Sequence, residues 1–180
     1  MTTFLSILRG INVSGQKKIL MKDLKTLYEE LKFKNVTTYI QSGNVIFESS
    51  SSKNPAKKIE QKIVERYSFN VPVIMRTVDE IQTVLKKNPF LKERNIDVEK
   101  LHVTFLTDIP KKELIDNIEG INYEPDKFIL SGKEIYLYCP HGYGITKLNN
   151  NFFEHKLKTT ATTRNWRTVN ELFKIMKSDR

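Results

Sequence analysis

The sequence predicts an α+β protein in which helices pack on one face of antiparallel sheets. Three observations lead to this fold class: short apolar runs alternate with amphipathic runs, two hairpin turns are present, and a nine-residue pattern occurs twice. The chain has 180 residues, of which 39% are hydrophobic and 28% charged, as in soluble globular proteins. This length suffices for one domain or for two small ones that share an interface.

The first 77 residues predict strands and helices in the order β-α-β-β-α-β. Residues 4–8 form a short apolar run, and residues 21–33 repeat leucines at helical spacing. Residues 36–41 and 44–48 predict a hairpin closed by Ser42-Gly43 as a two-residue turn. Asn54 followed by Pro55 predicts the start of the second helix, and Pro72 near the start of the fourth strand predicts an edge position.

This order of elements is that of a ferredoxin-like unit. In such a unit the third strand lies between the first and the second and is antiparallel to both. The end of the first strand and the hairpin after the second strand then fall at the same edge of the sheet. We therefore expect Arg9 and Asn12 to lie close to Gln41 and Asn44.

Residues 78–180 predict a second α+β half with the order αβαββαα, so we expect one half at 1–77 and the other at 78–180. A capping box over Thr77–Glu80 opens the first helix of this half, and Asn88-Pro89 ends it. A strand at 101–106, a helix at 110–118 and a hairpin about Ser131-Gly132 follow. Two helices complete the half, one over residues 146–157 and a last one that Thr163 caps.

An internal repeat links the two halves. Residues 39–47 and residues 128–136 both read aromatic, Ile, X, Ser, Gly, X, X, Ile, aromatic. Gln41 and Asn44 of the first copy are replaced by Leu130 and Lys133 in the second. A turn alone does not require both amides, although Asn44 also suits a turn because asparagine tolerates left-handed backbone.

Polar side chains that follow the first strand and polar side chains of the first hairpin make up the candidate binding site. Arg9 can pair with a phosphate or a carboxylate, and the alternative is a salt bridge to an acid such as Glu48. Asn12, Gln41, Ser42 and Asn44 supply further polar groups. Binding sites often lie on loops such as these, which a rigid sheet positions.

Two C-terminal segments add cationic and amide groups to this candidate site. Lys147 follows a glycine-containing loop and is expected at the start of a helix, where an anion is favoured. Arg164 and Asn165 are expected in the first turn of the last helix. A cation there opposes the helix dipole and so indicates an anionic partner, either a ligand or an acidic side chain.

Motifs of known catalytic chemistry are absent from the sequence. His102, His141 and His155 lack metal-ligand spacing, and the sequence has neither a Gly-x-Ser-x-Gly elbow nor a dinucleotide-binding fingerprint. Cys139 is a single cysteine and is interpreted as an inert buried thiol. We expect no metal and no cofactor, and the sequence leaves open whether the protein is an enzyme. The single cysteine and the lack of a signal-like N-terminus or a membrane-spanning run favour a cytoplasmic protein.

The net charge of +9 raises the question of a nucleic-acid partner. The lysines are scattered along the chain, mainly on the polar sides of predicted helices, where solvated lysines are usual. Single-strand binding would need exposed aromatic residues on a sheet face, for which Tyr39, Phe47, Tyr136 and Tyr138 are available.

Four segments make the sequence resemble a known bacterial family. They are Leu8-Arg-Gly-Ile-Asn-Val13, Tyr39-Ile-Gln-Ser-Gly-Asn-Val45, Lys147-Leu148 after a glycine-containing loop, and Ala161-Thr-Thr-Arg-Asn-Trp-Arg-Thr168. In this order they are similar to the signature segments of the domain of unknown function 1697 family. The resemblance implies an α+β protein of two ferredoxin-like halves and implies no activity, substrate or cofactor. The chain departs from the family pattern at Ser14 and at Ile145-Thr146.

The leading hypothesis from the sequence is a protein that binds an anionic small molecule or nucleotide-like ligand. Its ligand residues would be Arg9, Asn12, Gln41, Ser42, Asn44, Lys147, Arg164 and Asn165. Two alternatives remain, a nucleic-acid-binding module and a non-catalytic structural protein in which these motifs join the two halves. The sequence predicts no membrane partner and leaves the oligomeric state undetermined.

Overall fold

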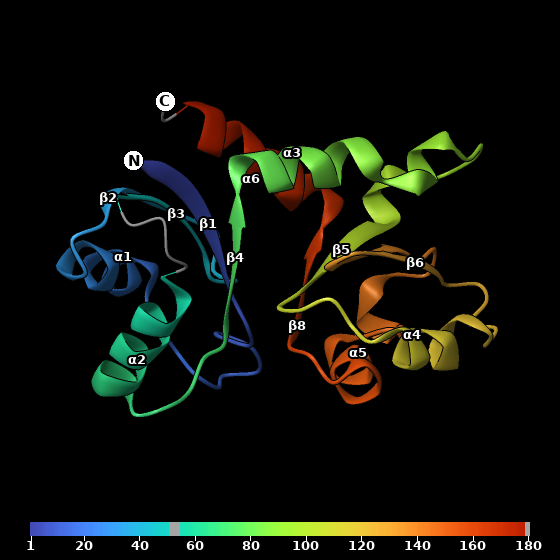
Figure 1. The fold of residues 1–180 in the computed structure, drawn as a ribbon, viewed down its shortest axis with the longest axis horizontal. Coiled ribbons are helices and arrows are strands. Elements are labelled where there is room, and N and C mark those ends of the chain that lie inside the picture. The colour runs from blue at the N-terminus through green and yellow to red at the C-terminus, as the bar shows by residue number, and fades with distance from the viewer. Residues whose placement is uncertain (51–54, 179–180) are drawn as a thin grey trace. The chain divides into compact units, whose positions relative to one another are not determined.

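The computed structural model describes residues 1–50 and 55–178 of the chain. These residues form an α+β fold with two four-stranded antiparallel sheets, each with helices packed against it (Figure 1). The chain divides into two compact units, one of residues 1–82 with 171–180 and one of residues 83–170. We call them the N-terminal unit and the C-terminal unit.

The N-terminal unit has the order βαββαβ that the sequence predicts. Its elements are β1 (Thr2–Leu8), α1 (Met21–Glu30), β2 (Lys34–Tyr39), β3 (Asn44–Ser49), α2 (Ala56–Tyr67) and β4 (Val73–Thr77). The strand order is β2-β3-β1-β4, so β3 lies between β1 and β2 and is antiparallel to both, as expected. β4 occupies the edge position that Pro72 predicts. The predicted cap Asn54 lies outside the described residues.

Helices α1 and α2 cover one face of this sheet (Figure 1). The periodic residues Leu24, Leu27 and Tyr28 of α1 are fully buried, and each such side chain contributes about 1.5–3 kcal/mol when it leaves water. They pack against Phe47 of β3, whose ring lies 5.2 Å from that of Tyr28. The Tyr28 hydroxyl lies 2.8 Å from the Ser6 hydroxyl in a hydrogen bond, and burial raises its pKa. The core therefore satisfies the phenol that it buries.

The C-terminal unit repeats this architecture and contains a strand that the sequence did not predict. Its strands are β5 (Leu101–Leu106), β6 (Lys127–Ser131), β7 (Glu134–Tyr138) and β8 (Ala161–Asn165), in the sheet order β6-β7-β5-β8. The covering helices are α4 (Lys112–Glu119) and α5 (Asn150–Leu157). Short 3-10 turns are η1 (Pro89–Lys92), η2 (Val98–Lys100) and η3 (Tyr143–Ile145).

Two helices have residues in both units. α3 (Val78–Lys87) begins with the predicted capping box, in which the Thr77 backbone N–H donates to Glu80 and the Glu80 N–H donates to the Thr77 hydroxyl. Asn88 follows its end, as predicted, and its side chain caps η1. α6 (Trp166–Ser178) buries Trp166, Val169, Leu172 and Met176.

The predicted start of the last helix at Thr163 is wrong, because residues 161–165 form β8 and pair with β5. The last strand of the C-terminal sheet is thus β8, as β4 is the last strand of the N-terminal sheet. The order of elements after β4 is therefore αβαββαβα, and the predicted order αβαββαα is wrong. Thr162 and Thr163 are β-branched and suit a strand. The helix is capped two residues later than expected, by the Asn165 side chain, which accepts a 2.7 Å hydrogen bond from the Thr168 N–H.

The two hairpins also differ from the predicted two-residue Ser-Gly turns. In the first, Tyr39 pairs with Asn44, so the connection has four residues, 40–43; in the second, Ser131 pairs with Glu134 and the turn is Gly132-Lys133. The repeated sequence pattern is consequently out of step with the sheet faces. Phe47 lies in the helix-covered core, whereas its counterpart Tyr136 lies on the other face of its sheet and donates to the Val84 carbonyl.

Candidate functional site

The end of β1, the first hairpin and the segment before β4 meet at one edge of the N-terminal sheet. The Leu8 N–H donates to the Gly43 carbonyl at 2.8 Å, and the Arg9 N–H donates to the Pro72 carbonyl at 2.9 Å. We call this region, residues 9–22, 39–44 and 68–72, the strand-end edge. The topological argument from the sequence, which placed the end of β1 beside the hairpin, is confirmed.

Asn12 holds this edge together through its side chain. Its carboxamide nitrogen donates to the carbonyls of Ile19 and Gln41, both at 2.9 Å, and its carboxamide oxygen accepts from the Ile19 N–H at 2.9 Å. Its backbone is left-handed, with φ of 54°, which asparagine adopts more readily than most residues. Asn12 therefore positions the loop rather than offering its amide to a ligand.

The loop that Asn12 closes is a small projecting turn. Val13 and Gln16 form a bridge around Ser14-Gly15, both of which have positive φ. The Lys17 ammonium donates to the Asn70 carbonyl at 2.6 Å and ties the loop to the segment before β4. Residues 13–16 and Lys18 are exposed, so this turn presents its surface to solvent while its base is fixed.

Asn44 serves the hairpin, as one of the two readings of the sequence proposed. It is fully buried, and its carboxamide donates to the Tyr39 carbonyl at 3.2 Å and to the Ser42 hydroxyl at 2.9 Å. The adjacent Gly43 has φ of 80°, and a Cβ there would lie 2.8 Å from Leu8 Cβ and 2.8 Å from Ile11 Cδ1. The hairpin thus packs against the end of β1, and Gln41 remains exposed beside it.

The charge of the strand-end edge is entirely positive. Its three segments contain Arg9, Lys17, Lys18 and Lys22 and no acidic residue. Arg9 is half-buried, and Lys18 and Lys22 are exposed. α1 begins here at Met21, its N-cap residue Leu20 makes no side-chain hydrogen bond, and Asp23 lies in its first turn. Uncapped N–H groups at a helix start add to the positive potential.

Glu48, the alternative partner of Arg9, lies far from it. Glu48 pairs with Thr3 across β1 and β3, six residues before Arg9. At about 3.3 Å per residue this is a separation on the order of 20 Å. A salt bridge between Arg9 and Glu48 is therefore wrong, whereas a salt bridge between Arg9 and another acidic residue stays a prediction.

Lys147, Arg164 and Asn165 belong to the C-terminal unit, whereas the five other predicted ligand residues belong to the N-terminal unit. A joint site of all eight residues stays a prediction. Lys147 does not lie at a helix start, because α5 begins at Asn150 and is capped by Asn149. Arg164 lies in β8, where its guanidinium donates to the Thr162 hydroxyl at 3.0 Å and the Thr163 carbonyl at 2.9 Å.

Arg164 has a counterpart that sequence reasoning missed. Arg76 of β4 is 2% exposed, and its guanidinium donates to the Met75 carbonyl at 2.8 Å, one residue before it, as Arg164 donates to the Thr163 carbonyl. Arg76 pairs with Leu5 of β1, and Arg164 pairs with Val103 of β5. Each unit thus buries one arginine on its last strand. The sequence signal that could have revealed this correspondence is the arginine near the end of the last strand of each unit, Arg76 in β4 and Arg164 in β8.

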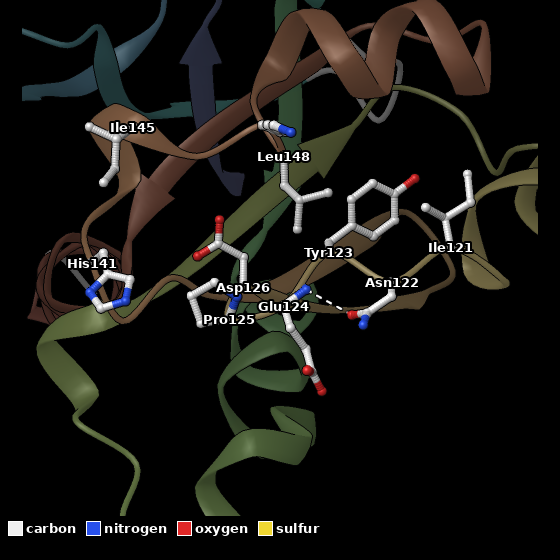
Figure 2. Close-up of a pocket in the computed structure, with 10 residues that line it drawn as sticks. Ile121, Asn122, Tyr123, Glu124, Pro125, Asp126, His141, Ile145 and Leu148 are labelled. Atoms are coloured by element: carbon white, nitrogen blue, oxygen red, sulfur yellow. Dashed lines mark hydrogen bonds between the residues drawn. The ribbon is translucent and has the colours of Figure 1, made fainter.

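A hollow of about 370 Å3 in the C-terminal unit was also missed by sequence reasoning (Figure 2). It lies against the loop of residues 121–126 and is lined by Tyr123 and Leu148 as well as by Asp126, Glu124 and Lys147. Asp126 accepts a hydrogen bond from the Thr146 hydroxyl. Two carboxylates beside one lysine make this hollow unsuited to a simple anion. No sequence motif marked it, because its residues converge only in the fold.

The side chains of residues 1–50 and 55–178 assemble no metal site. No cluster of three or more His, Cys, Asp or Glu side chains that could hold a metal occurs there. Burial, with a smaller contribution from Asp126, raises the pKa of the Cys139 thiol to about 11, so the thiol is protonated at neutral pH. Burial lowers the pKa of His102, whose ring stacks on Tyr143 at 4.9 Å.

The aromatic residues considered for nucleic-acid stacking are buried or half-buried. Phe47 and Tyr136 are buried, and Tyr39 and Tyr138 are half-buried. Bases need an exposed ring face to stack upon. In the described part of the chain, no helix is both long and apolar enough to cross a bilayer.

Comparison with known proteins places the chain in a family. A family model described as "Protein of unknown function (DUF1697)" matches residues 1–136. The chain belongs to the DUF1697 family. The conserved bacterial protein SP0830 from Streptococcus pneumoniae resembles the DUF1697 chain in structure with a TM-score of 0.77 and 22% identity, covering 98% of this chain and 99% of that one. At this identity the likeness shows a common fold alone. No curated protein matches the DUF1697 chain.

Proposed function

We propose that this protein binds an anionic small molecule, with a phosphate or carboxylate group, at the strand-end edge of the N-terminal unit. The observation that carries the proposal is the charge of this edge, which has four cationic residues and no acidic one over residues 9–22, 39–44 and 68–72. Such a field attracts and retains anions.

Arg9 is the proposed anchor for the anion. A guanidinium has five N–H donors in a planar fork, so it can contact neighbouring protein groups and an anion together. Its backbone N–H is fixed on the Pro72 carbonyl, which sets the root of the side chain. Lys17, Lys18 and Lys22 add charge around it.

The rigidity of the edge supports binding over a merely solvated patch. The Asn12 carboxamide joins the loop to the hairpin, and Lys17 joins it to Asn70. A site whose groups are already held loses less conformational entropy when it binds. No reaction is proposed, and the addition of Lys147, Arg164 and Asn165 to the site remains a hypothesis.

Titration with inorganic phosphate at low ionic strength tests the proposal. Arg9→Gln removes the anchor, and Arg94→Gln, an exposed arginine of the C-terminal unit, is the matched control for loss of one positive charge. We expect Arg9→Gln to weaken binding roughly 10- to 100-fold, the range of a charge-assisted hydrogen-bonded pair, and Arg94→Gln to have little effect. Equal weakening by both variants, or no binding by the wild type, would contradict the proposal.

A further inference from the structure

Ile40 adopts a backbone conformation that its side chain disfavours. Its φ is 50°, and among the non-glycine residues with positive φ in the described chain it is the β-branched one; the others are Asn, Ser or Lys. A β-branched residue in this region is a genuine outlier, because its Cβ substituents crowd the backbone. Such strain persists where the surroundings fix it, and it gathers at binding and active sites.

Burial does not compensate for this strain. The Ile40 side chain is 48% exposed, so folding removes only part of it from water. Asparagine or glycine would fit the hairpin position at lower cost. Isoleucine at residue 40 therefore combines a disfavoured backbone conformation with a residue that stays about half exposed.

Two further exposed apolar residues lie at the same edge. Val13 is 59% exposed and Leu20 is 69% exposed. The Asn12 carboxamide forms hydrogen bonds with Ile19 and Gln41. Val13 follows Asn12 in the sequence, Leu20 follows Ile19, and Ile40 precedes Gln41. Each of the three apolar residues is thus one position from a group in this hydrogen-bond cluster.

We infer that the ligand of the strand-end edge is an amphiphilic anion, with a phosphate or carboxylate group and an aliphatic or aromatic body. The charged group meets Arg9 and the neighbouring lysines, and the body lies on Ile40, Val13 and Leu20. This inference rests on the proposed function of the same edge. Ile40 then favours ligands that carry an apolar part, because its side chain contacts that part.

Two probes with one headgroup test the inference: inorganic phosphate and octyl phosphate below its micellar concentration. We expect the wild type to bind octyl phosphate on the order of tenfold or more tightly than inorganic phosphate, because binding removes the apolar surface of the octyl group from water. Ile40→Asn should abolish that difference, leave inorganic phosphate binding unchanged, and raise the melting temperature by roughly 2–4 °C as the strain is relieved. Ile109→Asn, at an exposed isoleucine of the C-terminal unit with no positive φ, should change none of the three.

The outcomes separate this inference from the proposed function. Equal binding of the two probes, lost together in Arg9→Gln, overturns the amphiphile and leaves anion binding intact. Absence of binding by both probes overturns both proposals. Sedimentation with phosphatidylcholine vesicles containing phosphatidylserine supplies a third arm. Pelleting that Ile40→Asn abolishes would mean a membrane surface as the partner and overturn a free small molecule.

Discussion

Replacement of Asn12 by glycine is the sharpest test of how the strand-end edge is held. Glycine accepts the left-handed backbone at this position, where φ is 54°, so the variant removes the carboxamide without adding strain. Three hydrogen bonds of 2.9 Å are lost with it.

The expected loss follows from those three bonds. Each contributes about 1 kcal/mol net, and water replaces part of the contribution at the exposed Gln41 carbonyl, which leaves roughly 2–3 kcal/mol. For a chain of this size that corresponds to a fall in melting temperature of roughly 4–12 °C. The amide of Ile19 loses its acceptor, so its hydrogen exchange should accelerate as well.

Asn35→Gly is the matched control for this experiment. Asn35 also has a left-handed backbone, with φ of 49°, but its side chain makes an exposed hydrogen bond to Glu48. We expect its replacement to change stability by less than about 0.5 kcal/mol. If thermal unfolding shows Asn12→Gly to be no more destabilising than Asn35→Gly, the Asn12 cluster does not hold the edge.

Three further predictions concern the packing and the titrating groups. In urea titrations, Gly43→Ala should lower the free energy of unfolding by about 1–3 kcal/mol more than Gly15→Ala. Both glycines have positive φ, but only a Cβ at residue 43 would meet Leu8 and Ile11. Equal losses in the two variants would refute the close packing. Burial raises the pKa of Tyr136 from about 10 in the unfolded chain to about 12, so its stabilising contribution is complete below pH 10 and is lost as the pH rises toward 12. Tyr136→Phe should therefore reduce the fall in the free energy of unfolding between pH 10 and pH 12. Parallel stability curves of the variant and the wild type over this range would contradict the prediction. Cys139 is buried with a pKa raised to about 11, so Ellman's reagent should label it at least about 100-fold more slowly in the native protein than in guanidinium; similar rates would show that the thiol is accessible.

The sequence predicted the fold where hydrophobic periodicity and turn signals agree. Leucine spacing located α1. The order of elements in the first 77 residues led to the correct strand order and to the edge where the end of β1 meets the hairpin. The strand β8 was missed because Thr163 resembles a helix cap. Its pairing with β5, a contact distant in sequence, makes it a strand.

The chemistry of the candidate site was less predictable than its place. The pattern of residue types could not distinguish an amide that binds a ligand from one that stabilises a loop. Asn12 and Asn44 were therefore predicted as ligand groups. In the structure, their carboxamides form hydrogen bonds with backbone and hydroxyl groups of the chain. The strain at Ile40 depends on a backbone angle that no periodicity reports. The hollow beside residues 121–126 arises from tertiary convergence alone.

The most direct test of anion binding at the strand-end edge is a crystal of the protein soaked in tungstate, a heavy tetrahedral analogue of phosphate. We predict an anomalous peak within hydrogen-bond distance of the Arg9 guanidinium, which disappears in crystals of Arg9→Gln. Tungstate bound only elsewhere, for example at Lys147 beside the hollow of the C-terminal unit, or an edge without any peak, would contradict the proposal.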